Sequence, residues 1–412
     1  MKSKKLICAA AMVLFAPTAK ASTTLYVNGV TGSDSDSCES PTTACKTIGH
    51  AISLAASGDN VIVSAATYSD VLTVSLNLNL IGAGASTTII DGRASGTVVT
   101  ISNTTAHVTL SNLTIRNGKA SSGAGIKNSG TLTLSKSVVT GNWAPIPCRH
   151  FFVFCEFSFG TAAGGGIYNS GVLIVSNSTI SANQAGSHCN ATPCSAFGGG
   201  IYNEGTQMVI ENSTLTGNSA DTACSTSISC GVGVGGAFYT VGATVTLNNS
   251  TITGNSAYRC SGTCGGTGGA IVNGFGTVAM DNSTVSGNSA GGIVNGGTAK
   301  LQNSIVDNNA GMNCGGTITS HGYNLSSDGT CKFNAPGDLN NHDPLLGPLQ
   351  NNGGPTQTMA LLSGSPAIDG GNPAGCTDGN GHLLTTDQRG MPRPDKEDAR
   401  GCDIGAYERQ SD

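Results

Sequence analysis

The sequence predicts an all-β protein folded as a right-handed parallel β-helix, a solenoid, with a capping helix before the coils and an irregular capping segment after them. A unit that begins Gly-Gly-x-Ile-x-Asn recurs along the middle of the chain. Within it, short β-prone runs are separated by Gly, Asn and Ser, as in folds built of many short strands. A repeat of about twenty residues with three such runs is typical of one coil of a β-helix.

The length of the repeat is measured from the Asn that precedes Ser-Thr. Four units place it at Asn177, Asn212, Asn249 and Asn282, with steps of 35, 37 and 33 residues. The steps shrink to 24 from Asn112 to Lys136 and to 21 from Asn282 to Asn303, where no Cys pair intervenes. The basic unit is therefore a coil of 21 to 24 residues, and each longer unit contains an insertion at one fixed point.

Side-chain alternation indicates how each coil is oriented. Leu132 and Leu134 alternate with Thr, as do Val245 and Leu247, which directs one residue in two toward a core. Leucine-rich repeats have the same length, but their Leu-x-x-Leu-x-Leu spacing and helix-forming half are missing here. Parallel strands joined by right-handed connections follow, with coils about 4.8 Å apart.

Two sets of Asn residues recur at fixed places, and we expect each set to form a ladder of side-chain amides along the axis. The first set is Asn128, Asn169, Asn203, Asn273 and Asn295, and the second is Asn117, Asn142, Asn183, Asn218, Asn255 and Asn288. The Gly pairs permit positive φ at a neighbouring corner. Five Asn also begin N-x-S/T sequons, for which we prefer a turn over a glycan: Asn112, Asn177, Asn212, Asn249 and Asn282.

The first 21 residues have the three parts of a secretory signal: basic residues, an apolar run from Leu6 to Phe15, and a cleavage site ending at Ala21. No later stretch approaches the roughly 20 apolar residues that span a bilayer. We therefore expect a mature chain from Ser22 that is secreted, periplasmic or displayed on a bacterial surface.

The mature chain has 14 of the 15 Cys, an even number that suits an oxidising compartment. We predict sequential pairing: Cys38 with Cys45, Cys148 with Cys155, Cys189 with Cys194, Cys224 with Cys230, Cys260 with Cys264, Cys314 with Cys331, and Cys376 with Cys402. Metal binding is the rival explanation for such close pairs, but their spacings vary and no His stands regularly beside them. No metal and no cofactor is expected.

Charge is sparse. Without the signal, 15 basic residues stand against 24 acidic ones, which gives a formal charge of −9. Nucleic acid and anionic membranes are poor partners for such a surface. The 60 Gly indicate many tight turns.

The chain divides into four predicted parts: residues 1–21, a signal; 22–100, the cap and first coils; 101–316, the repeats with insertions; and 317–412, the last segment. In the second part, Ile48, Ile52 and Ala55 have helical spacing, and Gly58-Asp-Asn-Val-Ile-Val and Thr67-Tyr68 follow. This order resembles the opening of pectin-lyase-like right-handed parallel β-helices.

The last part loses the repeat. It contains His342-Asp-Pro-Leu-Leu-Gly, Ser365-Pro-Ala-Ile-Asp, Asp387-Gln-Arg-Gly-Met-Pro-Arg and Cys402-Asp-Ile-Gly-Ala-Tyr-Glu408. These segments resemble the choice-of-anchor Q domain, the C-terminal part of bacterial surface-associated β-helix proteins. The four residues after Glu408 are expected to hold no anchor. The Gly-Gly-Ala-Ile and Gly-Asn-Ser-Ala elements upstream also resemble polymorphic outer-membrane protein repeats.

The open end of a β-helix is an exposed strand edge, which residues 317–412 are expected to cover. Asp387, Arg389, Arg393 and Asp403 are interpreted as an internal ion-pair network within this segment rather than as catalytic groups.

The insertions are expected to protrude as disulfide-tied loops. One of them holds five of the 10 Phe: Phe151, Phe152, Phe154, Phe157 and Phe159. This cluster is either a contact patch for a partner or a small core folded over its neighbours.

One pair of carboxylates is placed for glycoside chemistry. Glu211 and Asp281 hold the same coil position two coils apart, with Asn248 between them, so their backbones are expected about 9 to 10 Å apart. A polar position at a coil bend explains the pair equally well. Asp34, Asp36 and the stretch from Asp378 to Asn380 have oxygen ligands for Ca²⁺, but neither stretch completes a calcium loop, and solvated turns are preferred.

Three functions follow from these features. The preferred hypothesis is a non-enzymatic, adhesin-like surface protein that binds a glycan or cell-surface partner through its exposed faces and loops. The second is a polysaccharide lyase or glycoside hydrolase that uses Glu211 and Asp281. The third is a structural surface component. Oligomeric state and the identity of the ligand are not encoded in any motif.

Overall fold

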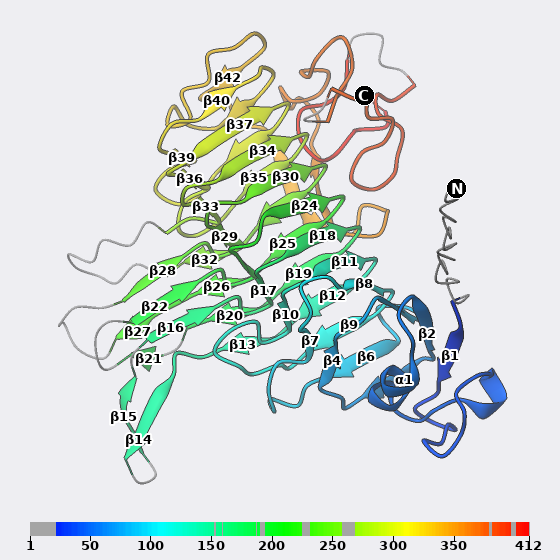
Figure 1. Cartoon of the computed structure of the whole chain (residues 1–412). Helices are drawn as coiled ribbons and strands as arrows, with labels where there is room; N and C mark the ends of the chain where they lie inside the picture. The colour runs from blue at the N-terminus through cyan, green and yellow to red at the C-terminus, as the bar shows by residue number, and fades with distance from the viewer. Residues whose placement is uncertain are drawn as a thin grey trace, which may run out of the picture.

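The computed structural model describes residues 22–151, 154–158, 160–186, 188–189, 194–224, 231–257, 268–378, 381–396 and 401–411. The predicted signal peptide lies outside these residues. Successive coils stack from the N-terminal helix toward the C-terminal end, and most coils contribute one strand to each of three long parallel sheets (Figure 1). The predicted right-handed parallel β-helix is confirmed.

Sheet 1 has eleven strands in the order in which the chain visits them. They are β1 (Thr24–Val27), β2 (Asp59–Val63), β5 (Leu78–Gly82), β8 (His107–Ser111), β11 (Thr131–Ser135), β18 (Val172–Ser176), β24 (Gln207–Glu211), β30 (Thr244–Asn248), β34 (Thr277–Asp281), β37 (Thr298–Gln302) and β40 (Thr319–Ser320).

Sheet 2 also has eleven strands and follows sheet 1 in each coil. They are β3 (Ala66–Tyr68), β6 (Thr88–Asp91), β9 (Thr114–Arg116), β12 (Val138–Thr140), β19 (Thr179–Ser181), β25 (Thr214–Thr216), β31 (Thr251–Thr253), β35 (Thr284–Ser286), β38 (Ile305–Asp307), β41 (Leu325–Ser326) and β42 (Leu339–Asn340).

Sheet 3 closes the coil with nine strands that come from the Gly-Gly-x-Ile-x-Asn elements and their equivalents. They are β4 (Leu72–Val74), β7 (Val99–Ile101), β10 (Ile126–Asn128), β17 (Ile167–Asn169), β23 (Ile201–Asn203), β29 (Phe238–Thr240), β33 (Ile271–Asn273), β36 (Ile293–Asn295) and β39 (Cys314–Gly315).

The core is a column of aliphatic side chains between the three sheets. In β11, Leu132 and Leu134 are buried and lie in register with Leu173 and Val175 of β18. Sheet 2 contributes residues such as Val139 to the same column. Since each apolar residue stacks on its equivalent one coil away, alternation in the sequence is sufficient to fill the core.

The corners between sheets 1 and 2 confirm the turn interpretation of the sequons. Asn112, Asn177 and Asn212 adopt φ of 49° to 55°, and Lys136 and Asn303 at equivalent positions have φ of 47° and 48°. Asn tolerates this left-handed conformation better than most residues. The Ser that follows is buried and accepts the backbone N–H of its equivalent one coil earlier, as from Ser137 to Ser178 at 3.1 Å.

The second predicted Asn ladder forms from Asn142 onward, and the first forms in two runs, from Asn128 to Asn203 and from Asn273 to Asn295. Asn128 donates to Asn169, which donates to Asn203, each at 2.6 Å, and Thr240 then takes the position of Asn. The second ladder joins Asn142, Asn183, Asn218, Asn255 and Asn288, and continues through Asn309 to Asn313.

The assignment of Asn117 to the second ladder was wrong. Asn117 has a φ of 56° and donates to the Asp91 carboxylate at 2.9 Å. The next residue, Gly118, occupies the ladder position, and its backbone N–H donates to Asn142 Oδ1. A shift of one residue at the first coil moves the side chain from the core to the corner.

The N-terminal cap has the expected order. Helix α1 (Ile48–Leu54) begins after Thr47, whose hydroxyl accepts the N–H of His50. Ile48 and Ala51 are buried against the first strands. A short 3-10 helix, η1 (Pro41–Thr43), precedes it.

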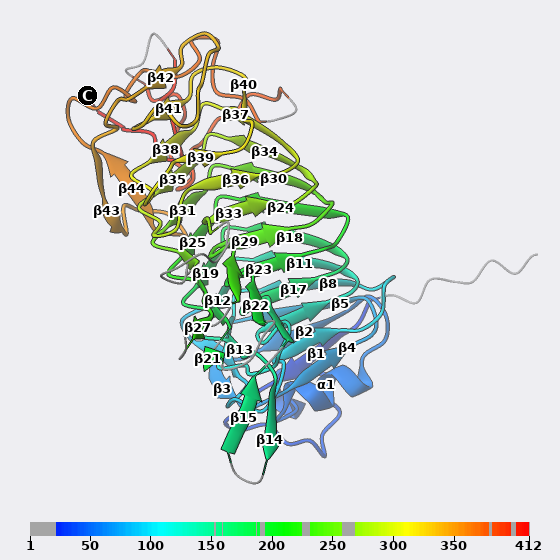
Figure 2. The same ribbon diagram turned by 90° about the vertical axis from the view of Figure 1, so that its left-hand side faces the viewer.

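Where the structure describes them, the insertions continue the stack beside the three main sheets. Their stems form short parallel sheets: β13 (Trp143–Ala144), β20 (Gln184–Ala185), β26 (Ser219–Ala220) and β32 (Ser256–Ala257); β16 (Gly160–Ala163), β22 (Cys194–Phe197) and β28 (Val232–Val234); and β21 (His188–Cys189) with β27 (Ala223–Cys224). Alanines bury a second, thinner core between these sheets. One insertion does project, as the antiparallel hairpin of β14 (Cys148–Phe151) and β15 (Phe154–Ser158) (Figures 1 and 2).

Three of the predicted disulfides are observed: Cys38–Cys45, Cys314–Cys331 and Cys376–Cys402, with Cα–Cα distances of 4.9, 4.7 and 5.9 Å. Cys194 is also disulfide-bonded. The other four predicted pairs each include a side chain outside the described part of the structure.

The C-terminal segment lies along the flank of the upper coils (Figure 1). It contains the antiparallel strands β43 (Leu346–Gln350) and β44 (Thr358–Leu361). Its hydrogen bonds follow the corner between sheets 1 and 2, at Asn212, Thr214, Asn249 and Asn282. The segment covers this corner in addition to packing against Ile305 and Leu325 of the last coils.

Candidate functional site

The predicted carboxylate pair has the expected register. Glu211 pairs with Asn248, and Asn248 pairs with Asp281, at the ends of β24, β30 and β34. The three side chains therefore stand in one row across neighbouring coils of sheet 1.

Asp281 does not face open solvent. Only 4% of its surface is exposed, and its neighbour Asn282 donates to the Thr377 carbonyl of the C-terminal segment at 2.8 Å. Burial, with the nearby Asp378 charge, raises the pKa of Asp281 to about 7. Two carboxylates that act on a polysaccharide both have to reach the scissile bond. The burial of Asp281 therefore counts against catalysis by this pair.

A different group of side chains occupies the outer face of sheet 3. Tyr168, Tyr202 and Tyr239 are register partners in β17, β23 and β29. Their ring centroids are 5.2 and 5.7 Å apart, with interplanar angles of 30° and 58°. We call these three residues the tyrosine ladder. All three are partly exposed, because the inward positions on either side of each Tyr fill the core instead.

Charged groups border the tyrosine ladder at one end. The Tyr168 hydroxyl donates to Glu204 Oε1, and the Lys127 Nζ lies 5.7 Å from the centre of the Tyr168 ring. Burial and the Glu204 charge raise the pKa of Tyr202 to about 12, and burial with the same carboxylate raises the pKa of Tyr168 further. The hydroxyls therefore remain protonated hydrogen-bond donors throughout the physiological range of pH.

Two further aromatic residues extend this surface. Phe197, at the end of β22, lies 5.3 Å from Tyr239 and 6.2 Å from Tyr202 between ring centroids. Phe275 is 80% exposed and follows Gly274, which lies against the Tyr239 ring. The face thus offers aromatic carbon, phenol hydroxyls and the Glu204 carboxylate, a combination that suits a ligand with both apolar and hydroxyl-rich surfaces.

The repeat itself contained the signal for this site. In Gly-Gly-x-Ile-x-Asn the second variable residue is Tyr at 168 and 202, and Tyr239 holds the same position in the divergent copy Gly235-Gly-Ala-Phe-Tyr-Thr240. The Asn and Ile of the element are structural, and this position alone points outward.

The Phe-rich insertion forms the projecting hairpin of β14 and β15. The side chains of Phe151, Phe154 and Phe157 lie outside the described part of the structure, as do Phe152 and Phe159 altogether. Whether they form a contact patch or a small core stays a prediction.

The C-terminal charges form an internal network, as predicted for Asp387, Arg389, Arg393 and Asp403, and Glu408 joins them. Arg389 pairs with Asp387 at 2.7 Å, and Arg393 pairs with Glu408 at 2.7 Å. Asp403 accepts backbone N–H groups of Asp369 and Arg409. Each of these groups is engaged within the segment, which supports a structural role.

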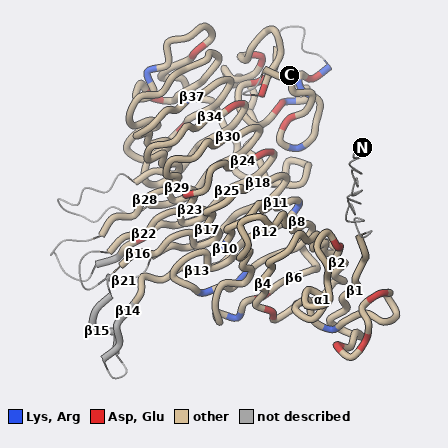
Figure 3. Tube along the Cα trace, in the orientation of Figure 1, with Lys and Arg blue, Asp and Glu red and all other residues tan. Residues whose placement is uncertain are grey.

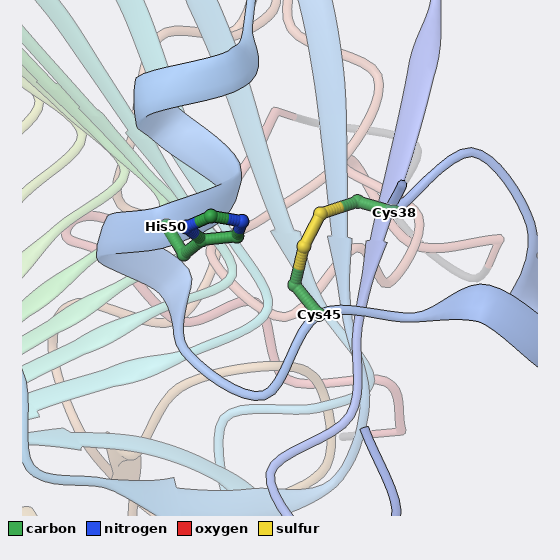
Figure 4. A group of neighbouring side chains, drawn as sticks. All are labelled: Cys38, Cys45 and His50. Carbon is green, nitrogen blue, oxygen red and sulfur yellow. A yellow bond between two sulfur atoms is a disulfide. The ribbon is translucent and has the colours of Figure 1, made fainter. Parts of the chain in front are cut away.

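Cys38, Cys45 and His50 lie close enough together to suggest a metal site. The Cys38, Cys45 and His50 side chains approach one another, but the two sulfur atoms are bonded to each other (Figure 4). Zinc binding requires thiolates, which a disulfide does not provide. Asp34, named above for Ca²⁺, accepts the backbone N–H groups of Lys46 and Thr47, so it orders this turn.

Charged residues are thinly spread over the coils (Figure 3). In the parts of the chain that the structure describes, no helix has the length and apolar character needed to cross a membrane.

Comparisons with known proteins give likenesses of fold. No family model matches the chain, and no curated protein matches it. Among solved structures, pectate lyase Pel9A is 14% identical and aligns over 94% of this chain and 98% of its own, with a TM-score of 0.46. Pectin methylesterase from Aspergillus niger is 14% identical over 79% and 88%, with a TM-score of 0.36, and pectin methylesterase PemA from Erwinia chrysanthemi is 13% identical over 70% and 80%, with a TM-score of 0.32. By its own stacked coils, the chain is a right-handed parallel β-helix protein.

Proposed function

We propose that this protein is secreted or displayed on a bacterial surface, where it binds a glycan on the outer face of sheet 3 without cleaving it. The observation that carries the proposal is the tyrosine ladder, three partly exposed rings at the same position of successive coils. Aromatic rings bind the apolar C–H faces of sugars, while hydroxyl and carboxylate groups bind the sugar hydroxyls.

The geometry favours an extended ligand that runs along the helix axis. The rings recur every coil at 5.2 and 5.7 Å, so a chain molecule meets equivalent groups as it passes from one coil to the next. Among the described residues, Lys127 is the basic residue that lies over one of the three rings, that of Tyr168. A polyuronate would require several cations, so the expected ligand is a neutral glycan.

The surface location is supported by the predicted signal at residues 1–21 and by the observed disulfides, which form in oxidising compartments. Within this proposal, residues 317–412 are a choice-of-anchor Q-like segment and residues 101–316 are the presenting stalk. An adhesin-like role follows from binding a surface glycan.

The test is a glycan array with the full mature chain, followed by titration of each bound glycan. Tyr168→Ala with Tyr202→Ala is expected to lower affinity by tenfold or more. Tyr26→Ala is the matched control, because Tyr26 is a partly exposed Tyr on sheet 1 at the other end of the molecule. Equal affinity of the ladder variant and the wild type, or an array without any bound glycan, would overturn the proposal.

Catalysis is tested separately. Wild-type protein is incubated with each bound polysaccharide and the products are measured as new reducing ends and unsaturated ends. No cleavage is expected. Cleavage by the wild type that is lost in the Glu211→Gln and Asp281→Asn double variant would show an enzyme in place of a binding protein.

A further inference from the structure

Two buried oxygen atoms on adjacent coils of sheet 1 have no hydrogen-bond partner among the described residues. They are Asn248 Oδ1 and Asp281 Oδ2. The two residues are direct register partners at the ends of β30 and β34, with 7% and 4% of their surface exposed. The two residues with unsatisfied oxygens therefore hold the same position on neighbouring strands.

Such a pair requires a physical explanation. A buried oxygen without a partner forgoes the hydrogen bond that it makes with water in the unfolded chain, and native proteins contain few of them. The contrast with the Asn ladders is direct, since at another corner of the same coils Asn255 donates to Asn288 Oδ1 at 3.0 Å. Asn248 Oδ1 and Asp281 Oδ2, by contrast, have no such partner.

The C-terminal segment brings a second carboxylate to the same place. Asn282 donates to the Thr377 carbonyl at 2.8 Å, and Gln302 reaches the Thr377 hydroxyl at 3.4 Å. Asp281 precedes Asn282 and Asp378 follows Thr377, so the hydrogen bond between Asn282 and Thr377 brings the two Asp residues near each other. Their proximity is also evident in the effect of the Asp378 charge on Asp281.

Three basic side chains of the C-terminal segment form ion pairs among the described residues. The recorded ion pair of Asp378 is with His382, which is 78% exposed and joins Oδ2 at 3.0 Å. The buried cations Arg389 and Arg393 of the segment pair with Asp387 and Glu408 instead. A carboxylate that is buried beside another carboxylate is stabilised by a bound cation.

We propose that Asn248, Asp281 and Asp378 bind a Ca²⁺ ion that fastens the C-terminal segment to the flank of the β-helix. The donors are two carboxylates and one amide oxygen, all hard ligands of the kind that Ca²⁺ takes in sets of six to eight, with water supplying the remainder. Mg²⁺ demands stricter octahedral geometry and releases its water less readily, so it is expected to bind more weakly.

The ion joins the coils to a segment that is far away in sequence. Asn248 and Asp281 belong to consecutive coils, and Asp378 belongs to the segment next to the Cys376–Cys402 disulfide. Ca²⁺ binding is therefore expected to stabilise the docked state of the segment, because a ligand that binds only the folded arrangement stabilises it. This inference is independent of glycan binding by the tyrosine ladder.

Isothermal titration of the full mature chain, stripped with a chelator and then dialysed, measures the binding. One Ca²⁺ per chain is expected, with a Kd of about 10⁻⁴ to 10⁻³ M, the range of extracellular sites. Asp281→Asn and Asp378→Asn are each expected to weaken binding by tenfold or more. Asn already occupies the equivalent position in β30, so Asp281→Asn fits the coil.

The matched control is Glu39→Gln, an exposed carboxylate at the other end of the molecule, which is expected to leave the Kd within twofold of wild type. Circular dichroism confirms folding of each variant. A second readout is limited proteolysis, in which 5 mM CaCl₂ is expected to slow cleavage after residue 362 in wild type and not in Asp281→Asn. Absence of Ca²⁺ binding by wild type, or unchanged binding by both Asn variants, would contradict the proposal.

Discussion

Arg393 and Glu408 form an ion pair that water does not reach. The Arg393 Nε lies 2.7 Å from Glu408 Oε2, and both side chains are 0% exposed. Arg393 also donates to Asn249 Oδ1 at 2.9 Å and to the Gly405 carbonyl at 2.8 Å. One guanidinium thus connects the C-terminal segment both to itself and to a corner of the β-helix.

Removal of this guanidinium is expected to destabilise the protein. Arg393→Met leaves Glu408 buried without its partner, which costs about 3 kcal/mol or more in the free energy of unfolding. Urea unfolding followed by circular dichroism measures it. Arg116→Met is the control, because the Arg116 side chain pairs with Asp91 at 39% exposure and such pairs contribute about 1 kcal/mol or less. Equal losses in the two variants would refute a special role for the buried pair.

The second Asn ladder is expected to be sensitive at its centre. Asn218 accepts both the backbone N–H and the Nδ2–H of Asn183, and donates to Asn255 and to the Ile180 carbonyl. Asn218→Ala leaves several buried groups unpaired, at a cost of roughly 2 to 3 kcal/mol. Gln184→Ala, at an exposed position of the preceding coil, is expected to change stability by about 0.5 kcal/mol or less. If Asn218→Ala and Gln184→Ala changed the free energy of unfolding by similar amounts, the ladder would contribute little to stability.

Titration of the phenols tests the electrostatics of the tyrosine ladder. Glu204→Gln removes the negative charge that disfavours phenolate at Tyr168 and Tyr202, so the pKa of each is expected to fall while burial still holds it above the ordinary value. Absorbance at 295 nm between pH 9 and 13 reports phenolate formation, and Tyr→Phe variants at 168 and 202 assign it. Identical titration curves for wild type and Glu204→Gln would exclude the carboxylate as a cause.

Asp403 gives the C-terminal segment a predictable dependence on pH. Burial and the Glu408 charge raise the pKa of Asp403 to about 7, whereas an unfolded Asp has a pKa of about 3.9. Between these values the folded state holds a proton that the unfolded state has lost, so the free energy of unfolding falls as pH rises from about 4 to 7.

In Asp403→Asn this contribution is absent. The stability of the variant relative to wild type is therefore expected to increase as pH rises from 4 to 7 and then to level off, in urea unfolding at fixed ionic strength. A constant difference across this range would show that Asp403 does not titrate there.

Much of the fold follows from the sequence because a β-helix is nearly one-dimensional, and each coil contacts only its neighbours. Leu132 and Leu134 predict the core by alternation, and Asn142 and Asn183 predict a ladder by recurrence. Asn117 was placed wrongly because a corner and a ladder position differ by one residue, and both accept Asn.

The functional sites were harder to predict. The register of Glu211 and Asp281 was foreseen, since it depends only on coil length, but the burial of Asp281 depends on a segment nearly one hundred residues later. No local pattern encodes that contact, because Thr377 and Asn282 meet only after the segment docks.

By itself, the sequence determined the coil, its core, its ladders and the sequential disulfides at Cys38, Cys314 and Cys376, all of which are set by spacing along the chain. Only the tertiary structure decided where the C-terminal segment lies, which carboxylates it buries, and that Tyr168, Tyr202 and Tyr239 share one exposed face with Phe197. The reason is physical: repetition fixes contacts between equivalent residues, whereas contacts between unlike segments depend on their packing in three dimensions.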